Sequence, residues 1–177
     1  MIHNQSVHIY QAGPDDADTI AQLSVATFRE TYGAFTSPEN MEVHIAEHFS
    51  PDIVRKELSE PGYRFFLATL ADRPVGFIKL RADRQPRGLP DQPCLEIQRI
   101  YVLQEFQGAS IGKELMHLAK QLAKEGSYKV LWLQVWQKNE KAIRFYQKSG
   151  FVIYETTSFP FGRETNADYL MRFDLHK

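Results

Sequence analysis

A short run of small residues is the clearest candidate for chemistry in the sequence. Gln107-Gly108-Ala109-Ser110-Ile111-Gly112-Lys113 stands between a predicted strand and a long predicted helix. Small residues let backbone N–H groups converge on an anion, and the dipole of the following helix adds to the attraction. Lys113 would add a full positive charge. The run therefore predicts a site for a pyrophosphate group.

Three interpretations of this run compete on spacing. An ATP-binding P-loop has the pattern Gly-x-x-x-x-Gly-Lys-Ser/Thr. Here only three residues separate Gly108 from Gly112, and Glu114 follows Lys113. A dinucleotide site needs Gly-x-Gly-x-x-Gly, which is also missing. A tight turn followed by a helix cap accounts for Gly108 and Ser110 without any ligand, so the run alone leaves a structural turn open.

The elements that would position this run follow from apolar spacing and turn residues. Ser37 is the expected N-cap of a second helix, with Pro38 at its first position. The first half of the chain predicts a strand at 7–10, helices from 17 to about 32 and from 38 to Pro51, and a helical piece around Val54 and Leu58. Strands at 64–70 and 75–80 and a long loop at 81–93 are predicted to follow.

The second half alternates strands and helices. It predicts a strand at 95–102, a helix from 111 that Gly126 ends, a strand at 129–135, a helix at 139–148, and closing strands at 151–157 and 168–173 that are linked by 159–162. This order predicts an α+β fold in one domain spanning 1–177. A mixed central sheet of about seven strands would be flanked by helices.

The composition excludes several function classes. The chain has 177 residues, with 21 Lys and Arg against 22 Asp and Glu and a net charge of −1. That balance argues against a nucleic-acid partner, because such proteins carry a basic excess. With no apolar run that could span a bilayer and no signal peptide, we expect a cytoplasmic protein without a membrane partner. Cys94 is expected to be a small buried residue, and no metal site is predicted.

Residues in and around the small-residue run resemble a known family. Gln107, Ile111 and Gly112 match motif A of the GNAT N-acetyltransferases, Gln/Arg-x-x-Gly-x-Gly/Ala, whereas Ser110 replaces the usual first glycine. The resemblance covers about 95–159. Within this range, 97–102 is similar to the family's fourth strand, 139–146 to its Asn-x-x-Ala-x-x-Phe/Leu-Tyr helix, and 149–151 to the Gly-Phe segment that follows that helix.

A closer resemblance is to polyamine N-acetyltransferases of the PaiA type, whose substrates are spermidine and spermine. It is carried by residues 27–32, 37–41, 95–102 and 132–140. It implies an enzyme that moves the acetyl group of acetyl-CoA, its co-substrate, to a small primary amine by direct transfer in a ternary complex. A polyamine is the expected acceptor.

The resemblance implies contacts with acetyl-CoA. The backbone of Ile100, Tyr101 and Val102 would face the pantetheine arm, with the Ile100 N–H polarising the thioester carbonyl. The backbone from Gln107 to Lys113 would hold the pyrophosphate. Asn139 would bond the pantetheine amides, although its position also fits a plain N-cap. Lys148 is a further candidate contact.

Two side chains are the candidate catalytic groups. Tyr146 would protonate the departing CoA thiolate. Glu96 would accept a proton from the attacking ammonium, directly or through a water; a salt-bridged strand residue is the alternative. Because Glu96 precedes Ile100 by four residues, a regular strand would place both on one face.

The acceptor pocket has further candidates. Glu30 would bind a second ammonium of a polyamine, with a solvated helix acid as the alternative, and Tyr32 would line the pocket. Trp132, Gln134 and Trp136 alternate along one strand, which fits either core packing or an aromatic cage for a cation.

Two other functions stay open. A protein acetyltransferase acting on a lysine or an N-terminus would need an open groove near residues 81–93. A non-catalytic acyl-CoA sensor would share the fold, but the presence of both Glu96 and Tyr146 favours an enzyme. The sequence leaves the oligomeric state open, a homodimer included.

Overall fold

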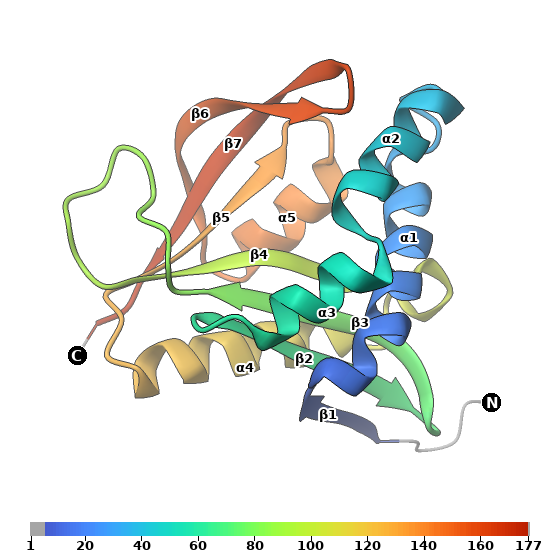
Figure 1. Cartoon of the computed structure of the whole chain (residues 1–177). Helices are drawn as coiled ribbons and strands as arrows, with labels where there is room; N and C mark the ends of the chain where they lie inside the picture. The colour runs from blue at the N-terminus through green and yellow to red at the C-terminus, as the bar shows by residue number, and fades with distance from the viewer. Residues whose placement is uncertain (1–5, 177) are drawn as a thin grey trace.

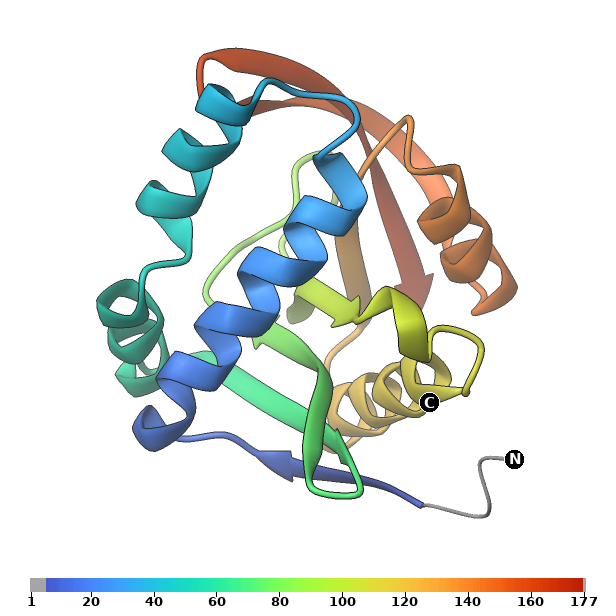
Figure 2. The ribbon, with the colours of Figure 1, turned by 90° about the vertical axis from the view of Figure 1, so that its right-hand side faces the viewer.

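One mixed β-sheet runs through the molecule, and helices cover both of its faces (Figures 1 and 2). The computed structural model describes residues 6–176. The strands are β1 (Val7–Gln11), β2 (Tyr63–Leu70), β3 (Arg73–Arg81), β4 (Cys94–Val102), β5 (Val130–Trp136), β6 (Val152–Phe161) and β7 (Glu164–Asp174). The helices are α1 (Ala17–Tyr32), α2 (Pro38–His48), α3 (Pro51–Ser59), α4 (Ile111–Glu125) and α5 (Glu140–Lys148), with single turns η1 (Pro14–Asp16) and η2 (Gln104–Phe106).

The strands lie in the order β1-β2-β3-β4-β5-β7-β6. β4 and β5 run parallel, and every other neighbouring pair is antiparallel. Residues of α4 and α5 pack into the core on one face of the sheet, and residues of α1 and α3 pack into the core on the other. The predicted α+β fold with one mixed, seven-stranded sheet is therefore confirmed.

Several helices begin where the sequence supplies a cap. Ser37 Oγ accepts a hydrogen bond from the Asn40 N–H at 3.1 Å, and Pro38 occupies the first position of α2, as predicted. Ser50 repeats the arrangement for α3. Pro51 was expected only to end the second helix. It also begins the third, since proline fits the first turn of a helix.

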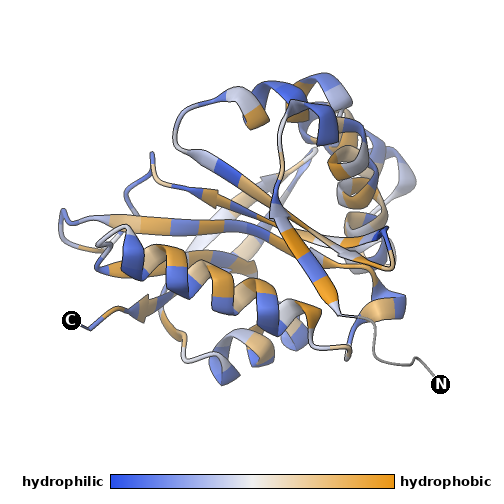
Figure 3. Cartoon of the chain, turned by 90° about the horizontal axis from the view of Figure 1, so that it is seen from below, coloured by the Kyte–Doolittle hydropathy of each residue, from blue (hydrophilic) through white to orange (hydrophobic). Residues whose placement is uncertain are grey.

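α4 shows the amphipathic pattern that places it on the sheet. Its residues Ile111, Leu115 and Ala119 are buried in the core, while Lys113 and Glu114 are exposed. Figure 3 shows the resulting alternation of apolar and polar residues along the helix. In the described part of the chain, no helix combines the length and the apolar character that a bilayer span requires.

The last two strands are longer than predicted. Phe159, Pro160 and Phe161 were expected to form a link, but they continue β6, and the turn lies at Gly162 with φ +58°. β6 is an edge strand, so the N–H that Pro160 lacks is not needed on the outer side. The longer β6–β7 hairpin reaches across to α2 (Figure 1).

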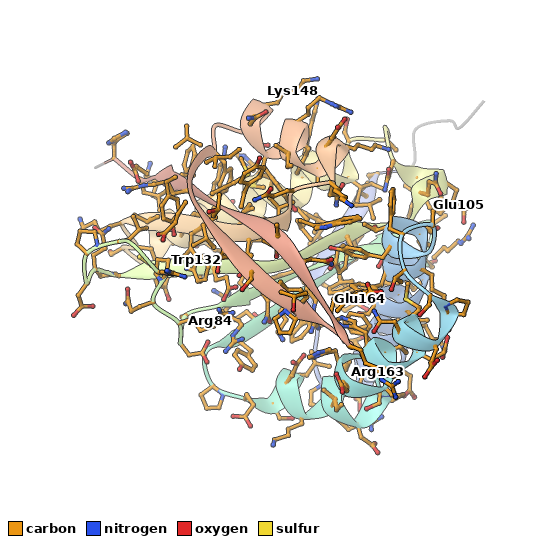
Figure 4. The ribbon with its side chains drawn as sticks, turned by 90° about the horizontal axis from the view of Figure 1, so that it is seen from above. Arg84, Glu105, Trp132, Lys148, Arg163 and Glu164 are labelled. Carbon is orange, nitrogen blue, oxygen red and sulfur yellow. The ribbon has the colours of Figure 1, made fainter. Side chains whose placement is uncertain are left out.

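Asn40 fixes the hairpin to α2. Its side chain is 5% exposed, donates from Nδ2 to the Phe161 carbonyl at 2.9 Å, and accepts at Oδ1 from the Arg163 N–H at 2.7 Å. A Cβ at Gly162 would lie 2.0 Å from Asn40 Oδ1, so only glycine fits this turn. The exposed Arg163 and Glu164 mark the tip of the hairpin in Figure 4.

Replacing Asn40 by alanine should destabilise the fold by about 2–4 kcal/mol, because two backbone groups of the hairpin lose their buried partner. Denaturant-induced unfolding measures this change. The control is Asn166→Ala on the same hairpin, whose side chain makes no hydrogen bond within the described residues. Equal losses in the two variants would contradict the role given to Asn40.

Candidate active site

A cavity of about 190 Å³ lies where β4 and β5 separate. The two strands pair only through Cys94–Glu96 and Val130–Trp132, and then diverge (Figure 1). α1, α2, α5 and the β6–β7 hairpin complete the walls. Of the predicted site residues, the cavity brings together Tyr32, Glu96, Ile100, Tyr101, Asn139 and Tyr146.

A β-bulge in β4 changes which side chains face the cavity. Lys79 of β3 is opposite Arg99, and Leu80 is opposite Ile97, so Gln98 has no opposite residue. The extra residue reverses the alternation of side chains along the strand. Glu96 therefore lies on the face of α1, whereas Ile100 packs into the core beneath α4. The prediction that Glu96 and Ile100 share a face is wrong.

Ile100 is nevertheless one of the residues that line the cavity. Beyond Glu96, the edge of β4 that faces β5 has no strand partner. Its N–H and C=O groups are available to an extended ligand that lies between the strands. The Val102 carbonyl is the exception, because Gln107 Nε2 donates to it at 3.1 Å.

Glu96 is a buried carboxylate with one counter-ion. Its residue is 2% exposed, and Oε1 accepts from Arg84 Nη1 at 3.2 Å. Arg84 belongs to the loop 82–93, and its guanidinium lies 5.5 Å from the ring centroid of Trp132 (Figure 4). Glu96 Oε2 has no hydrogen-bond partner within residues 6–176. Burial raises the pKa of Glu96, and Arg84 opposes that rise.

Tyr146 projects from α5 into the same cavity. Burial raises the pKa of its hydroxyl well above the ordinary value of a phenol, and Tyr101 adds to the rise. Burial also raises the pKa of Tyr32, helped by Tyr101, Asp168 and Tyr146. At neutral pH these hydroxyls therefore keep their protons, and Tyr146 has a proton to donate.

The Gln107–Lys113 run forms an exposed turn into α4. Gly108 has φ +91° and Ser110 has φ +65°, so Ser110 carries a side chain in the left-handed region that favours glycine. Ser110 is the N-cap, yet its side chain makes no capping hydrogen bond. The first N–H groups of α4 have no partner within the described residues. These free donors at a helix start fit a pyrophosphate group.

Asn139, Gln107 and Lys141 hold the start of α5. Asn139 Oδ1 accepts from the Ala142 N–H at 3.3 Å, so the N-cap role is confirmed, and the residue also lines the cavity. The Gln107 side chain accepts from Lys141 Nζ as well as donating to Val102. Gln107 therefore ties the end of β4 to α5.

Two predicted residues lie elsewhere. The Glu30 carboxylate is exposed and accepts from the Gln104 N–H at 3.0 Å, outside the cavity. Lys148 is exposed at the end of α5 and points away from the sheet (Figure 4). Core packing and an aromatic cage were the two interpretations of Trp132 and Trp136. Trp132 is buried in the core, whereas Trp136 lines the cavity. Cys94 is buried, as predicted.

Sequence reasoning missed Asp168, His44 and His48, which all line the cavity. Asp168 gave no signal, because its position depends on how β7 pairs with β5. The histidines gave one: they stand four residues apart on α2, and their ring centroids are 4.4 Å apart. Burial lowers the pKa of His44 to about 4, so its ring is neutral. The described residues hold no group of three metal-ligating side chains.

The comparisons with known proteins agree with this geometry. The model of the acetyltransferase (GNAT) family matches residues 23–151. An uncharacterised N-acetyltransferase of Lactobacillus delbrueckii is 32% identical over 94% of this chain and 96% of its own length. Spermidine N(1)-acetyltransferase of Thermoplasma acidophilum is 26% identical over 88% of this chain and 94% of its own.

Solved structures share the fold. The PaiA N-acetyltransferase of T. acidophilum in complex with coenzyme A superposes with a TM-score of 0.78 at 23% identity, over 96% of this chain and 99% of that one. A GCN5-related N-acetyltransferase of Rhodopseudomonas palustris gives 0.76 at 22% identity, over 99% and 100%. By its match to the family model and to these relatives, the chain belongs to the GNAT family of acetyl-CoA-dependent N-acetyltransferases.

Proposed function

We propose that the protein acetylates a primary amine of a polyamine, such as spermidine or spermine, by direct transfer in a ternary complex. The observation that carries this proposal is a cavity with aromatic walls that holds two buried carboxylates, Glu96 and Asp168. Aromatic faces and carboxylates are the groups that bind ammonium ions. The similarity to the spermidine acetyltransferase of T. acidophilum supports the same class of acceptor.

The chain offers acetyl-CoA two kinds of contact. The exposed turn before α4 suits the pyrophosphate, and the unpaired edge of β4 suits the pantetheine arm. Acetyl-CoA supplies the acetyl thioester. A backbone N–H of β4, that of Ile100 in this proposal, stabilises the negative charge that develops on the carbonyl oxygen.

Glu96 and Tyr146 move the protons. An alkylammonium has a pKa of about 10, so it must lose a proton before its nitrogen can attack. Glu96 takes that proton, directly or through a water. The nitrogen bonds to the acetyl carbon, the carbon–sulfur bond breaks, and Tyr146 gives its hydroxyl proton to the leaving sulfur. The second proton that the nitrogen loses on becoming an amide restores the Tyr146 hydroxyl. No thiol of the chain carries the acetyl group, since Cys94 is buried away from the cavity.

Release of free CoA thiol should depend on a polyamine. The assay compares spermidine, spermine, arylalkylamines, amino acids and a lysine peptide at equal concentration, with acetyl-CoA saturating. We expect spermidine and spermine to give the highest kcat/KM. Turnover with the peptide alone would replace the proposal by a protein acetyltransferase, and tight acetyl-CoA binding without any turnover would replace it by a sensor.

Tyr146→Phe should lower kcat by about 10²- to 10⁴-fold, because the thiolate then leaves without a proton donor. The Kd for acetyl-CoA should stay the same, since the ring remains. Steady-state kinetics and calorimetry measure the two quantities. Tyr128→Phe, a half-buried tyrosine outside the cavity, is the matched control. An unchanged kcat in Tyr146→Phe would remove Tyr146 as the acid.

Glu96→Gln should change the pH dependence of kcat/KM for the amine. Burial raises the pKa of Glu96, so the wild type loses its base as the pH falls through that pKa. The variant has no base at any pH and depends on free amine. Its deficit should be about 10²- to 10⁴-fold near neutral pH and should shrink towards pH about 10, where the amine itself is deprotonated.

The exposed Glu60→Gln is the control for Glu96→Gln and should follow the wild-type profile. If Glu96→Gln also follows the wild-type profile, a group other than Glu96 accepts the proton of the attacking ammonium.

A further inference from the structure

Asp168 is a buried carboxylate that the proton transfers above do not use. We propose that Asp168, oriented by Gln134, binds the non-reacting ammonium of the acceptor and thereby selects diamines and polyamines over monoamines. This inference rests on the proposed function and assigns a specificity-determining residue within the same cavity.

The hydrogen bonds of Asp168 leave one oxygen free. The residue lies on β7 and is 5% exposed. Oδ2 accepts from Gln134 Nε2 at 2.9 Å, whereas Oδ1 is buried and has no partner among residues 6–176. A buried carboxylate oxygen without a donor is costly, and native structures normally supply one. The missing donor is expected from a ligand.

The charges of the cavity point to a cation as that ligand. Glu96 has Arg84 at 3.2 Å, and Arg99 has Glu57 at 3.5 Å. Within residues 6–176, no Lys, Arg or His nitrogen lies within 4.0 Å of Asp168, so Asp168 is the carboxylate of the cavity wall that lacks a counter-ion. An alkylammonium would supply both the charge and the N–H donors that Asp168 Oδ1 lacks.

The position of Asp168 separates it from Glu96. In the sheet, Glu96 is opposite Trp132, and Asp168 is opposite Trp136, which lies four residues further along β5. At the rise of a regular strand, this offset is about 13 Å along the sheet, and β5 lies between them. The two carboxylates therefore meet different ends of a long acceptor.

The wall next to Asp168 suits an alkyl chain. Trp136 lines the cavity beside it, and the ring centroids of Tyr32 and Trp136 are 5.0 Å apart. Methylene groups pack against these rings, and an ammonium beside them gains a favourable interaction with the aromatic faces. Gln134 donates to Oδ2 and so fixes the carboxylate with Oδ1 free.

Asp168→Asn tests the inference, because asparagine keeps an acceptor for Gln134 and removes the charge. The acceptors are spermidine, 1,8-diaminooctane, which has the chain length of spermidine, and nonylamine, in which a methyl group replaces the second amino group of the diamine. We expect kcat/KM to fall about 10- to 100-fold for spermidine and the diamine, mainly through KM. The kcat/KM for nonylamine and the KM for acetyl-CoA should not change.

Asp15→Asn is the matched control, since Asp15 is exposed in η1 and its loss changes the net charge equally. If Asp168→Asn does not fold, calorimetric titration of the wild type replaces it. The wild type should then bind 1,8-diaminooctane at least 10-fold more tightly than nonylamine, on the same estimate of a charged hydrogen bond.

Other outcomes overturn the inference. Equal losses with the diamine and nonylamine would give Asp168 a role in folding or in the reaction itself. A wild type that acetylates both amines equally well would refute selection by Asp168 while leaving the proposed function intact. A wild type that acetylates no amine would remove the proposed function and this inference together.

Discussion

Backbone hydrogen bonding along β4 is the constraint on which the rest of the structure depends. β3 pairs with one edge of β4 from Glu96 to Val102, interrupted at Gln98, but β5 pairs with the other edge only as far as Glu96. Unpaired N–H and C=O groups inside a protein need other partners. The gap between the strands therefore has a polar floor, and helices and the β6–β7 hairpin supply its mostly aromatic walls.

Charge is distributed unevenly around this gap. On the α1 face of the sheet, Lys79 is fully buried, and its ion pair with Glu57 at 2.8 Å accompanies a pKa lowered to about 7, chiefly by burial. Arg99 shares the same carboxylate. These cations pair with Glu57, and within residues 6–176 neither of them forms an ion pair with Asp168. The pairing with Glu57 thus leaves Asp168 without a competing cation of the protein.

The sequence predicts what depends on local spacing. Apolar periodicity and caps predict the helices and strands. The resemblance to the Asn-x-x-Ala-x-x-Phe/Leu-Tyr helix of the GNAT family identifies Asn139 and Tyr146 as site residues. The Gln98 bulge left a signal that was missed: Leu95 and Ile97 alternate with polar residues, but two polar residues precede Ile100, so the alternation shifts by one position. Asp168 lines the cavity because β7 pairs with β5, and Glu30 lies outside it because α1 directs that side chain towards Gln104. Both positions depend on tertiary packing.

The contact between Asn40 and the hairpin has a consequence for the order of folding. Asn40 and Phe161 are 121 residues apart in sequence, and the contact closes the loop that contains most of the sheet. Contacts of such separation form late, since the loop-closure entropy must be overcome first. An unfinished chain that ends before β6 has strand β4 with its partly unpaired edge and helix α4, but it lacks the cavity wall that the β6–β7 hairpin supplies. Under the proposed function, amine recognition is therefore acquired only when the last strands have been made.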